Sequence, residues 1–355
     1  MFYFVNLLVL IVYSWLFKYF KIKRKKYLIL TAIHIGGIIA FRSCNTGTDT
    51  YQYYNVYRML IEYKGDLSTL IRIYVKFPGW AVFFKGVSLL FGNDPNFYML
   101  VSGYLVVAVT WIAIGLFEVD ETQSVILYYL IFALQAMNIT RQNMALCLLF
   151  LSAALFIKKK RIFSFLLMGF AVSIHISAVI GVAILLVLAL NWTRKRVFYA
   201  ISASMIILLS VNVLFDLFAS TLSGYSTYIL GAFKASGRNV VMQIIYILTF
   251  LYAIWIQKKY CLDKDMEQLL LKGCILIWGE ILLGTFFSIE IFIVRENLYL
   301  QIFIILFVPI VTMFFNRYRK IYRFIVYGMA FFYFSYRVLS NYGGIMPYQT
   351  YLFQK

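Results

Sequence analysis

The chain has 355 residues, of which 63% are hydrophobic and only 13% are charged, and its formal net charge is +19. Because soluble domains carry about 25% charged residues, this composition excludes a soluble globular protein. A strongly positive charge would indicate nucleic-acid binding in a soluble protein, but in a membrane protein it reflects the Lys- and Arg-rich cytoplasmic loops of the positive-inside rule, so we expect no nucleic-acid partner.

Apolar blocks alternate with short basic clusters along the whole chain, a pattern typical of many transmembrane helices. We therefore predict an all-α polytopic membrane protein in which residues 1–355 form a single integral membrane domain. The clusters assigned to the cytoplasm are KIKRKK (21–26), KKKR (158–161), RKR (194–196) and RYRKIYR (317–323).

The first block, residues 1–20, lacks a basic leader and a small-residue cleavage site, so we expect a retained helix that runs from outside to inside. Residues 27–41 return outward. The block 162–191 lies between two basic clusters and is predicted to form two short helices with His175 near an external tip. Further spans are predicted at 197–215, 240–256, 273–291, 297–315 and 322–340. The total is about twelve spans, with both termini outside.

Residues 79–92 pose a question of topology, because this apolar block is short and contains Lys85. If it crossed the membrane, Arg141 would lie inside and KKKR outside, against the positive-inside rule. If it is a re-entrant or interfacial helix, EVDETQ (118–123) lies inside, Arg141 outside and KKKR inside. We favour the second alternative, since non-helical backbone at membrane depth is tolerated where it lines a protein cavity.

A compact polar stretch, FRSCNTGTDTYQYYNVY (41–57), interrupts the apolar sequence on the external side. It can be read as a helix end, with Gly47 in a left-handed turn and Asp49 capping the next helix. It can also be read as part of a site in which Asp49 is a base. The tyrosines fit either a sugar-binding surface or an aromatic belt at the membrane interface.

Arg141 and Gln142 begin the next polar motif, TRQN (140–143), on the same external side. Arg141 is either a flanking charge that reaches the interface or a charge-assisted donor that adds to helix N-terminal amides in an anion site. His175 is either a satisfied core residue or a group that binds phosphate or relays a proton.

Three further residues are candidates of the same kind. Arg295 and Arg238 would supply second and third cationic contacts for a diphosphate, although Arg295 could instead pair locally with Glu296. Glu280 lies within an apolar block, and an ionisable residue inside the membrane indicates function by default. The sequence has no metal-ligand spacing and no nucleotide-binding motif, so we expect no metal and no cofactor.

The stretches FRSCNTGTDTYQYYNVY, TRQNMALCLLFLSAALFIKKKRIFSFLLMGFAVSIHISAVIG, VRENLYLQIFIILFVP and MPYQ together resemble the EpsG family of bacterial polysaccharide polymerases, from about residue 41 to 349. These are Wzy-like membrane proteins of capsule and exopolysaccharide synthesis. The resemblance implies a fold like that of GT-C and Wzy-type lipid-sugar glycosyltransferases. The polar motif positions that it maps onto this chain are Arg42, Gly47, Thr48, Asp49, Tyr53, Arg141, Gln142, His175, Arg295 and Pro347.

The resemblance also implies an activity: joining undecaprenyl-diphosphate-linked oligosaccharide repeat units at the outer face of the bacterial cytoplasmic membrane, without a nucleotide sugar or a metal. Asp49, Arg141 and His175 are then the predicted catalytic residues. The predicted partners are the lipid-linked oligosaccharide and the bilayer, together with a flippase and a chain-length regulator. The predicted substrate-binding residues are Arg42, Thr48, Tyr53, Gln142, Arg238 and Arg295.

Two other functions remain open from the residues alone. One is a transporter or flippase of lipid-linked sugars in which Glu280 relays protons, although no internal inverted repeat is visible between the halves. The other is a ligase or monomer glycosyltransferase that uses the same kind of polyprenyl-phosphate donor.

Overall fold

The computed structural model describes residues 1–62, 68, 77–117, 119–219, 240–286, 297–314 and 317–353. Most of these residues are helical, and the only β-structure among them is an isolated antiparallel bridge between Arg42 and Thr350. The chain divides into two compact units. Unit 1 comprises Met1–Gly181 with Phe324–Lys355, and unit 2 comprises Val182–Arg323. The prediction that residues 1–355 form a single integral membrane domain stays a prediction.

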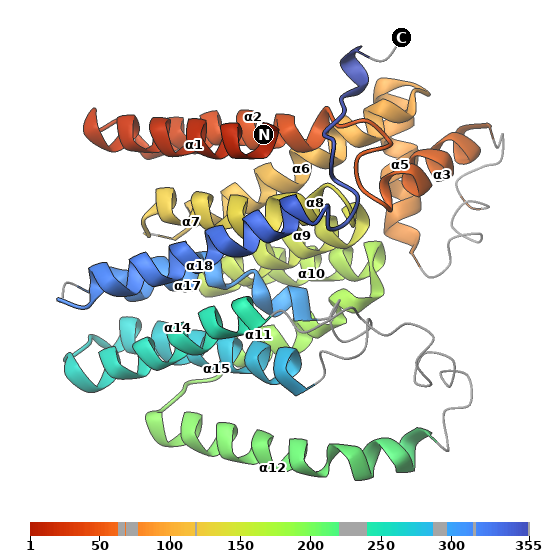
Figure 1. Ribbon diagram of the computed structural model, residues 1–355. Helices are drawn as coiled ribbons and strands as arrows, with labels where there is room; N and C mark the ends of the chain where they lie inside the picture. Colours follow the sequence, from red (N-terminus) through yellow and green to blue (C-terminus); the bar gives the residue numbers. More distant parts are fainter. Residues whose placement is uncertain are drawn as a thin grey trace. The chain divides into compact units, whose positions relative to one another are not determined.

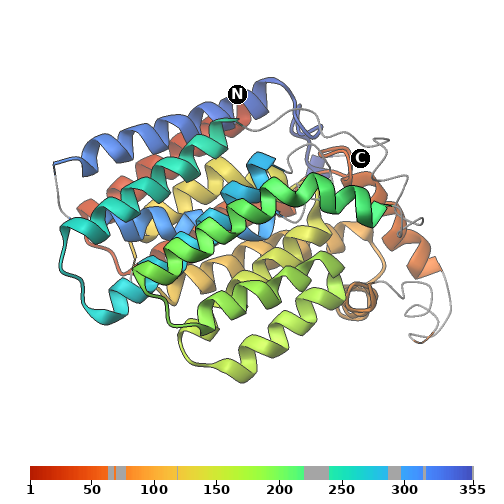
Figure 2. The ribbon, with the colours of Figure 1, turned by 90° about the horizontal axis from the view of Figure 1, so that it is seen from below.

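Unit 1 is a layer of antiparallel helices (Figure 1). α2 packs along α6, where the ring of Tyr104 lies against Gly36 and Trp111 Nε1 donates to Thr31 Oγ1 at 2.6 Å. α18 lies alongside α1 (Figure 2), with Phe334 edge-on to the ring of Phe4. The helices are α1 (Phe2–Tyr19), α2 (Arg24–Ala40), α3 (Thr50–Glu62), α5 (Pro78–Phe91), α6 (Pro95–Gly115), α7 (Glu121–Tyr128), α8 (Leu134–Ala136), α9 (Thr140–Ile157), α10 (Arg161–Ile174) and most of α18 (Arg319–Leu339).

Unit 2 is built on α15, which packs against α12, α14 and α17. Trp278 Nε1 on α15 donates to Ser204 Oγ on α12 at 2.9 Å, and the Tyr322 hydroxyl in the first turn of α18 donates to Thr249 Oγ1 on α14 at 2.9 Å. The bounds are α11 (Gly181–Ala189), α12 (Arg194–Ala219), α14 (Val240–Lys259), α15 (Lys264–Phe286) and α17 (Ile304–Thr312).

The helices follow the predicted apolar blocks closely. The predicted break near His175 is confirmed, because α10 ends there and His175 adopts an extended conformation, with φ −147° and ψ 115°, before the 3₁₀ turn Ile176–Ile180. The prediction of about twelve spans is not confirmed. Only α1, α6, α9 and α14 among the described residues are long and apolar enough to cross a membrane. α5, with 14 residues, covers about 21 Å against about 30 Å of hydrocarbon.

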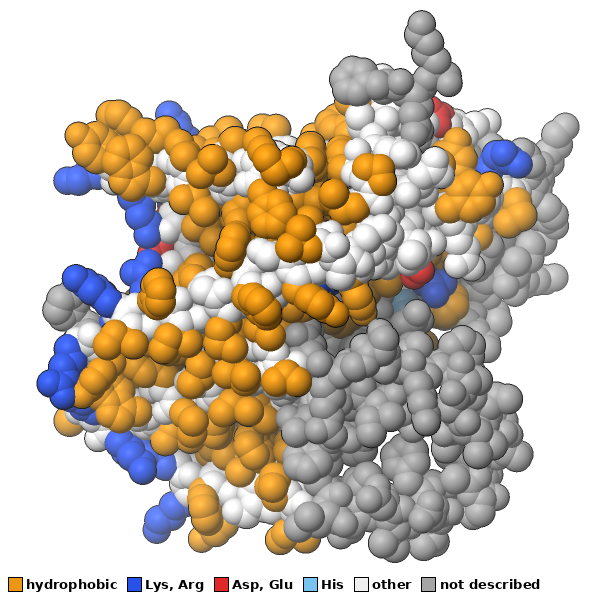
Figure 3. Space-filling model, viewed as in Figure 1, with side chains coloured by type: hydrophobic (Ala, Val, Ile, Leu, Met, Phe, Trp, Pro, Cys, Tyr) orange, Lys and Arg blue, Asp and Glu red, His pale blue; other side chains and the backbone are white. Residues whose placement is uncertain are grey.

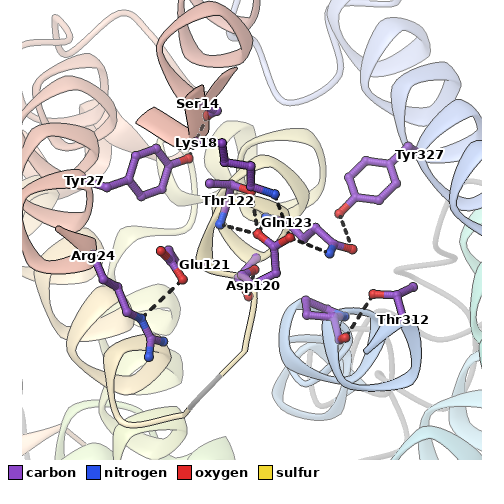
Figure 4. Close-up of polar contacts among 12 residues, drawn as sticks. Ser14, Lys18, Arg24, Tyr27, Asp120, Glu121, Thr122, Gln123, Thr312 and Tyr327 are labelled. Atoms are coloured by element: carbon purple, nitrogen blue, oxygen red, sulfur yellow. Dashed lines mark hydrogen bonds and ion pairs between the residues drawn. The ribbon is translucent and has the colours of Figure 1, made fainter. Parts of the chain in front are cut away.

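Two ion pairs at one end of unit 1 bear on the topology of residues 79–92 (Figure 4). Lys18 Nζ lies 2.7 Å from Asp120 Oδ2, and Arg24 Nε lies 3.3 Å from Glu121 Oε2. Paired groups share one membrane face, so the chain crosses an even number of times between them. α2 and α6 run antiparallel over this interval, and if both cross the membrane, these pairs require that α5 does not. The alternative in which α5 does not cross is consistent with the two pairs and stays a prediction.

Asp120 is also the N-cap of α7, where Oδ1 accepts from the backbone N–H groups of Thr122 and Gln123. Burial raises the pKa of its carboxyl, but hydrogen bonds from Lys18, Thr122 and Gln123 outweigh burial and lower the pKa to about 2. Asp120 is therefore ionised at neutral pH. It fixes the start of α7 and holds α1 beside it through Lys18.

Hydrophobic side chains cover the outward faces of α1 and α2, and Lys and Arg side chains gather near one end of these helices (Figure 3). Exposed apolar residues such as Leu8, Trp15 and Ile33 contribute to this surface. An apolar exterior ending in basic side chains is expected where helices meet lipid and then the cytoplasmic interface.

Candidate functional site

The polar stretch after α2 forms a turn that is fastened to the C-terminal segment of the chain. Gly47 N–H donates to Gly344 O and Thr48 N–H to Gly343 O, both at 2.9 Å, while Ser43 N–H donates to Gln349 O at 2.8 Å. These bonds join segments that are about 300 residues apart in sequence. These bonds fix the turn at the end of the helix layer. They also give partners to backbone N–H and C=O groups, which need hydrogen bonds when they are away from water.

Gly47 permits this turn, because its φ is +98° and a Cβ there would lie 2.9 Å from Met137 O. We expect Gly47→Ala to destabilise the protein by about 1–3 kcal/mol, since both the backbone conformation and the close approach oppose a side chain. Thermal unfolding in detergent measures this as a lowered Tm. The control is Gly86→Ala in α5, where a Cβ meets nothing within 4 Å. A Gly47→Ala protein as stable as wild type would contradict this account of the turn.

Asp49 is the last residue before α3, and its position is set by a neighbour that the sequence did not indicate. Asn138 Oδ1 accepts from the Asp49 backbone N–H at 2.8 Å and from Thr48 Oγ1 at 3.1 Å. Thr50 Oγ1 donates to Met137 O at 2.9 Å. The Asp49 carboxylate is half-buried, and Thr48 Oγ1 lies 3.4 Å from its Oδ1. The backbone is thus held by Asn138, and the carboxylate points to no described cation.

Arg42 is fully buried, although the sequence assigns it to substrate binding. One terminal nitrogen donates to Ile39 O and the other to Thr140 Oγ1 at 2.8 Å. Burial lowers the pKa of Arg42 to about 10, so the side chain remains cationic at neutral pH. In this structure the charge joins the end of α2 to the start of α9 rather than facing outward, and its predicted contact with substrate remains a prediction.

Arg141, in the first turn of α9, is held differently. Its guanidinium carbon lies 3.9 Å from the centroid of the Phe77 ring and 4.8 Å from that of Trp80. The group makes no hydrogen bond or ion pair with any residue that the structure describes, and its Nε is buried. Cation–π contacts use the faces of the planar group, so its N–H donors remain directed along the edges.

His175 belongs to the same cluster through Phe77. The two rings lie 6.0 Å apart between centroids at an angle of 30°, and Nδ1 of His175 bonds the hydroxyl of Ser177. Phe77 thus contacts both Arg141 and His175, which are 34 positions apart in sequence.

The remaining predicted residues divide into two groups. Tyr53 packs edge-on to Trp80 with centroids 5.7 Å apart, which connects α3 to the aromatic residues around Arg141, whereas Gln142 is buried within α9. Arg238 and Arg295 lie outside the described residues, so their predicted contacts stay predictions. Phe77, Trp80 and Asn138 are the neighbours that sequence reasoning missed. Phe77 and Trp80 resemble any other apolar residue in the sequence, and Asn138 lies just before TRQN without a distinctive spacing.

The described residues contain no group of three or more His, Cys, Asp or Glu side chains that could hold a metal ion. The described site therefore offers three kinds of group to a ligand. These are the guanidinium of Arg141 and the imidazole of His175, which both lie beside the ring of Phe77, and the half-buried carboxylate of Asp49 on the turn before α3. Such a set fits an anionic group joined to a sugar, since guanidinium N–H groups match phosphate oxygens and aromatic faces pack against sugar rings.

Comparison with known proteins gives one match. No curated protein and no solved structure matches the chain. The family model of the EpsG family matches residues 25–350, which is nearly the whole chain and includes all the residues of the site. The chain therefore belongs to the EpsG family, a family of Wzy-like polymerases.

Proposed function

We propose that this protein is a polysaccharide polymerase that joins undecaprenyl-diphosphate-linked oligosaccharide repeat units at the outer face of the bacterial cytoplasmic membrane. The observation that carries the proposal is Arg141, a half-buried guanidinium stacked on Phe77 and Trp80 that has no anionic partner among the described residues. A cation held in this way is suited to an anion that arrives with the substrate.

The reaction transfers a glycan from its lipid diphosphate to a hydroxyl group of a second lipid-linked unit. The acceptor oxygen forms a bond to the anomeric carbon as the bond from that carbon to the diphosphate breaks. Negative charge then develops on the leaving diphosphate, and Arg141 stabilises it with donors that are already in place. His175, whose ring centroid lies 6.0 Å from that of Phe77, is the second group proposed to act near this charge.

The acceptor hydroxyl loses a proton in this step, and Asp49 is the carboxylate proposed to take it. Its backbone N–H is bonded to Asn138, which fixes the residue without occupying the carboxylate. A general base must lie within hydrogen-bond reach of the proton that it removes, and a fixed backbone favours such a geometry. Tyr53 beside Trp80 contributes an aromatic surface for sugar rings.

The test uses purified protein in lipid vesicles with lipid-linked repeat units, followed by sizing of the glycans. A ladder of longer products supports a polymerase. A single addition, or transfer to a different acceptor, would instead indicate a monomer glycosyltransferase or a ligase. Movement of the substrate across the bilayer without any new glycan would indicate a transporter and would refute the enzyme proposal.

A further inference from the structure

A buried acidic residue in unit 2 has no part in the proposed reaction. Glu280 lies in the second half of α15 with no exposed surface. Three side-chain amides from two neighbouring segments donate to its Oε1. The donors are Gln243 Nε2 on α14 at 3.0 Å, Asn297 Nδ2 at 3.2 Å and Gln301 Nε2 at 3.3 Å.

The hydrogen bonds around this carboxyl group are asymmetric. Oε1 accepts all three of these bonds, whereas Oε2 is buried and has no partner among the described residues. Asn297 is also nearly fully buried, and its Oδ1 is without a partner as well. Two buried oxygens that both accept cannot satisfy each other, and each unsatisfied group costs free energy. One proton on Oε2 removes the conflict, because the acid then donates where the carboxylate only accepts.

The surroundings also disfavour an ionised carboxylate. None of the described Lys, Arg or His residues forms an ion pair with Glu280. Among the described residues, the titratable groups of α14 and of 297–303 are Tyr246, whose hydroxyl donates to Gln301 O at 3.2 Å, Tyr299, and, further along α14, Tyr252, Lys258 and Lys259. α12 contacts α15 through Ser204 and Trp278, neither of which carries a charge. An isolated buried charge is far more costly than its neutral form.

We infer that Glu280 is held as a neutral carboxylic acid whose Oε2 proton is shared with Oδ1 of Asn297, so that unit 2 contains a proton-binding site between α14, α15 and the residues that precede α17. The acid and the amide then form a reciprocal pair, in which Asn297 Nδ2 donates to Oε1 and Oε2 donates to Asn297 Oδ1. A metal cation is a poor alternative occupant, since it requires several oxygen ligands and the cluster presents three N–H donors.

The site is closely fitted to this arrangement. A Cβ at Gly284, one turn after Glu280, would lie 1.8 Å from Gln243 Nε2. Because Gly284 has no side chain, there is space at this position for the Gln243 side chain to reach the carboxyl group of Glu280. Because the donors come from α14 and from Asn297 and Gln301, loss of the proton places an unpaired charge among three chain segments. The folded unit keeps this proton above the pH of about 4 at which an unfolded glutamate releases it, so the stability of unit 2 falls as the pH rises from there through neutral and alkaline values.

Glu280→Gln tests the inference, because a glutamine reproduces the neutral acid. Its Oε1 accepts the three amide bonds and its Nε2 donates to Asn297 Oδ1. We expect Glu280→Gln to keep the wild-type Tm in detergent at neutral pH and to be less sensitive to alkaline pH than wild type. Glu280→Ala, which leaves the three amides without an acceptor, should lower Tm by about 5 °C or more. A Glu280→Gln protein as unstable at neutral pH as Glu280→Ala would overturn the inference.

Infrared spectroscopy gives a second and direct readout. Protein labelled with carboxyl-¹³C glutamate should show the carbonyl stretch of a protonated carboxylic acid at neutral pH. The band should be absent from Glu280→Gln and present in the control Glu267→Gln, which alters a partly exposed, ion-paired glutamate on the same helix. Absence of the band from wild-type protein would overturn the inference even if no variant folds. Neither measurement depends on polymerase activity.

Discussion

Arg141→Ala should abolish most glycan polymerisation in vesicles while the protein still inserts and folds. Removing one preorganised donor to a developing oxyanion typically lowers kcat by about 10²–10³-fold, and Arg141 is the cation of the described site that has no internal partner. The rate of product formation at saturating substrate measures the effect. Because the donor acts most strongly on charge that develops in the transition state, kcat should fall more than KM rises.

Two further variants make this prediction specific. Arg141→Lys keeps the charge but loses the planar group that stacks on Phe77 and Trp80, so it should recover only part of the rate. Arg161→Ala removes another arginine that lies over an aromatic ring, 5.9 Å from the centroid of Phe156, at the basic end of α10. This control should leave the rate unchanged. Full activity of Arg141→Ala would exclude Arg141 from the reaction.

Asp49→Asn should lower the rate of chain extension by about 10²–10⁴-fold, the usual contribution of a general base. The substitution preserves the size of the side chain and the backbone N–H bond to Asn138, so the turn and the start of α3 should stay in place. Thermal unfolding checks this, and an unchanged Tm separates a catalytic loss from a folding defect.

The matched control is Asp265→Asn, which removes an exposed carboxylate from the first turn of α15. Its activity should equal that of wild type. If Asp49→Asn retained full turnover with a wild-type Tm, the base would have to be another group. Asp49 would then have only a structural role, in the turn that precedes α3.

The sequence predicted the helices well, because an apolar block as long as a membrane span can form few structures other than a helix. It also predicted that the helix over 162–191 breaks at His175, which basic clusters on both sides require and the extended backbone at His175 confirms. Its count of about twelve spans is not confirmed. α5 and α10 have 14 residues each, and length alone does not say whether such a helix crosses, turns back or lies at the interface.

Residues 79–92 show where a long-range contact adds evidence that the sequence lacks, although their topology stays a prediction. The positive-inside rule favoured a re-entrant helix only because that topology places KKKR (158–161) inside and Arg141 outside. The ion pair between Lys18 and Asp120, 102 positions apart, places two loops at the same end of the helix layer. Which charges meet depends on how α1, α2, α6 and α7 pack, and no local pattern carries that information.

By itself the sequence determined that this is a helical membrane protein of the EpsG family. Hydropathy, basic clusters and the order of short motifs are properties of the chain and can be recognised in the sequence alone. Only the tertiary structure separated two arginines that look alike in sequence. Arg42 is fully buried and its two terminal nitrogens donate to Ile39 O and Thr140 Oγ1, whereas Arg141 is stacked on Phe77 and Trp80 with no described anion beside it. The difference lies in partners from distant segments, and the free energy of a charge depends on those partners more than on its neighbours in sequence.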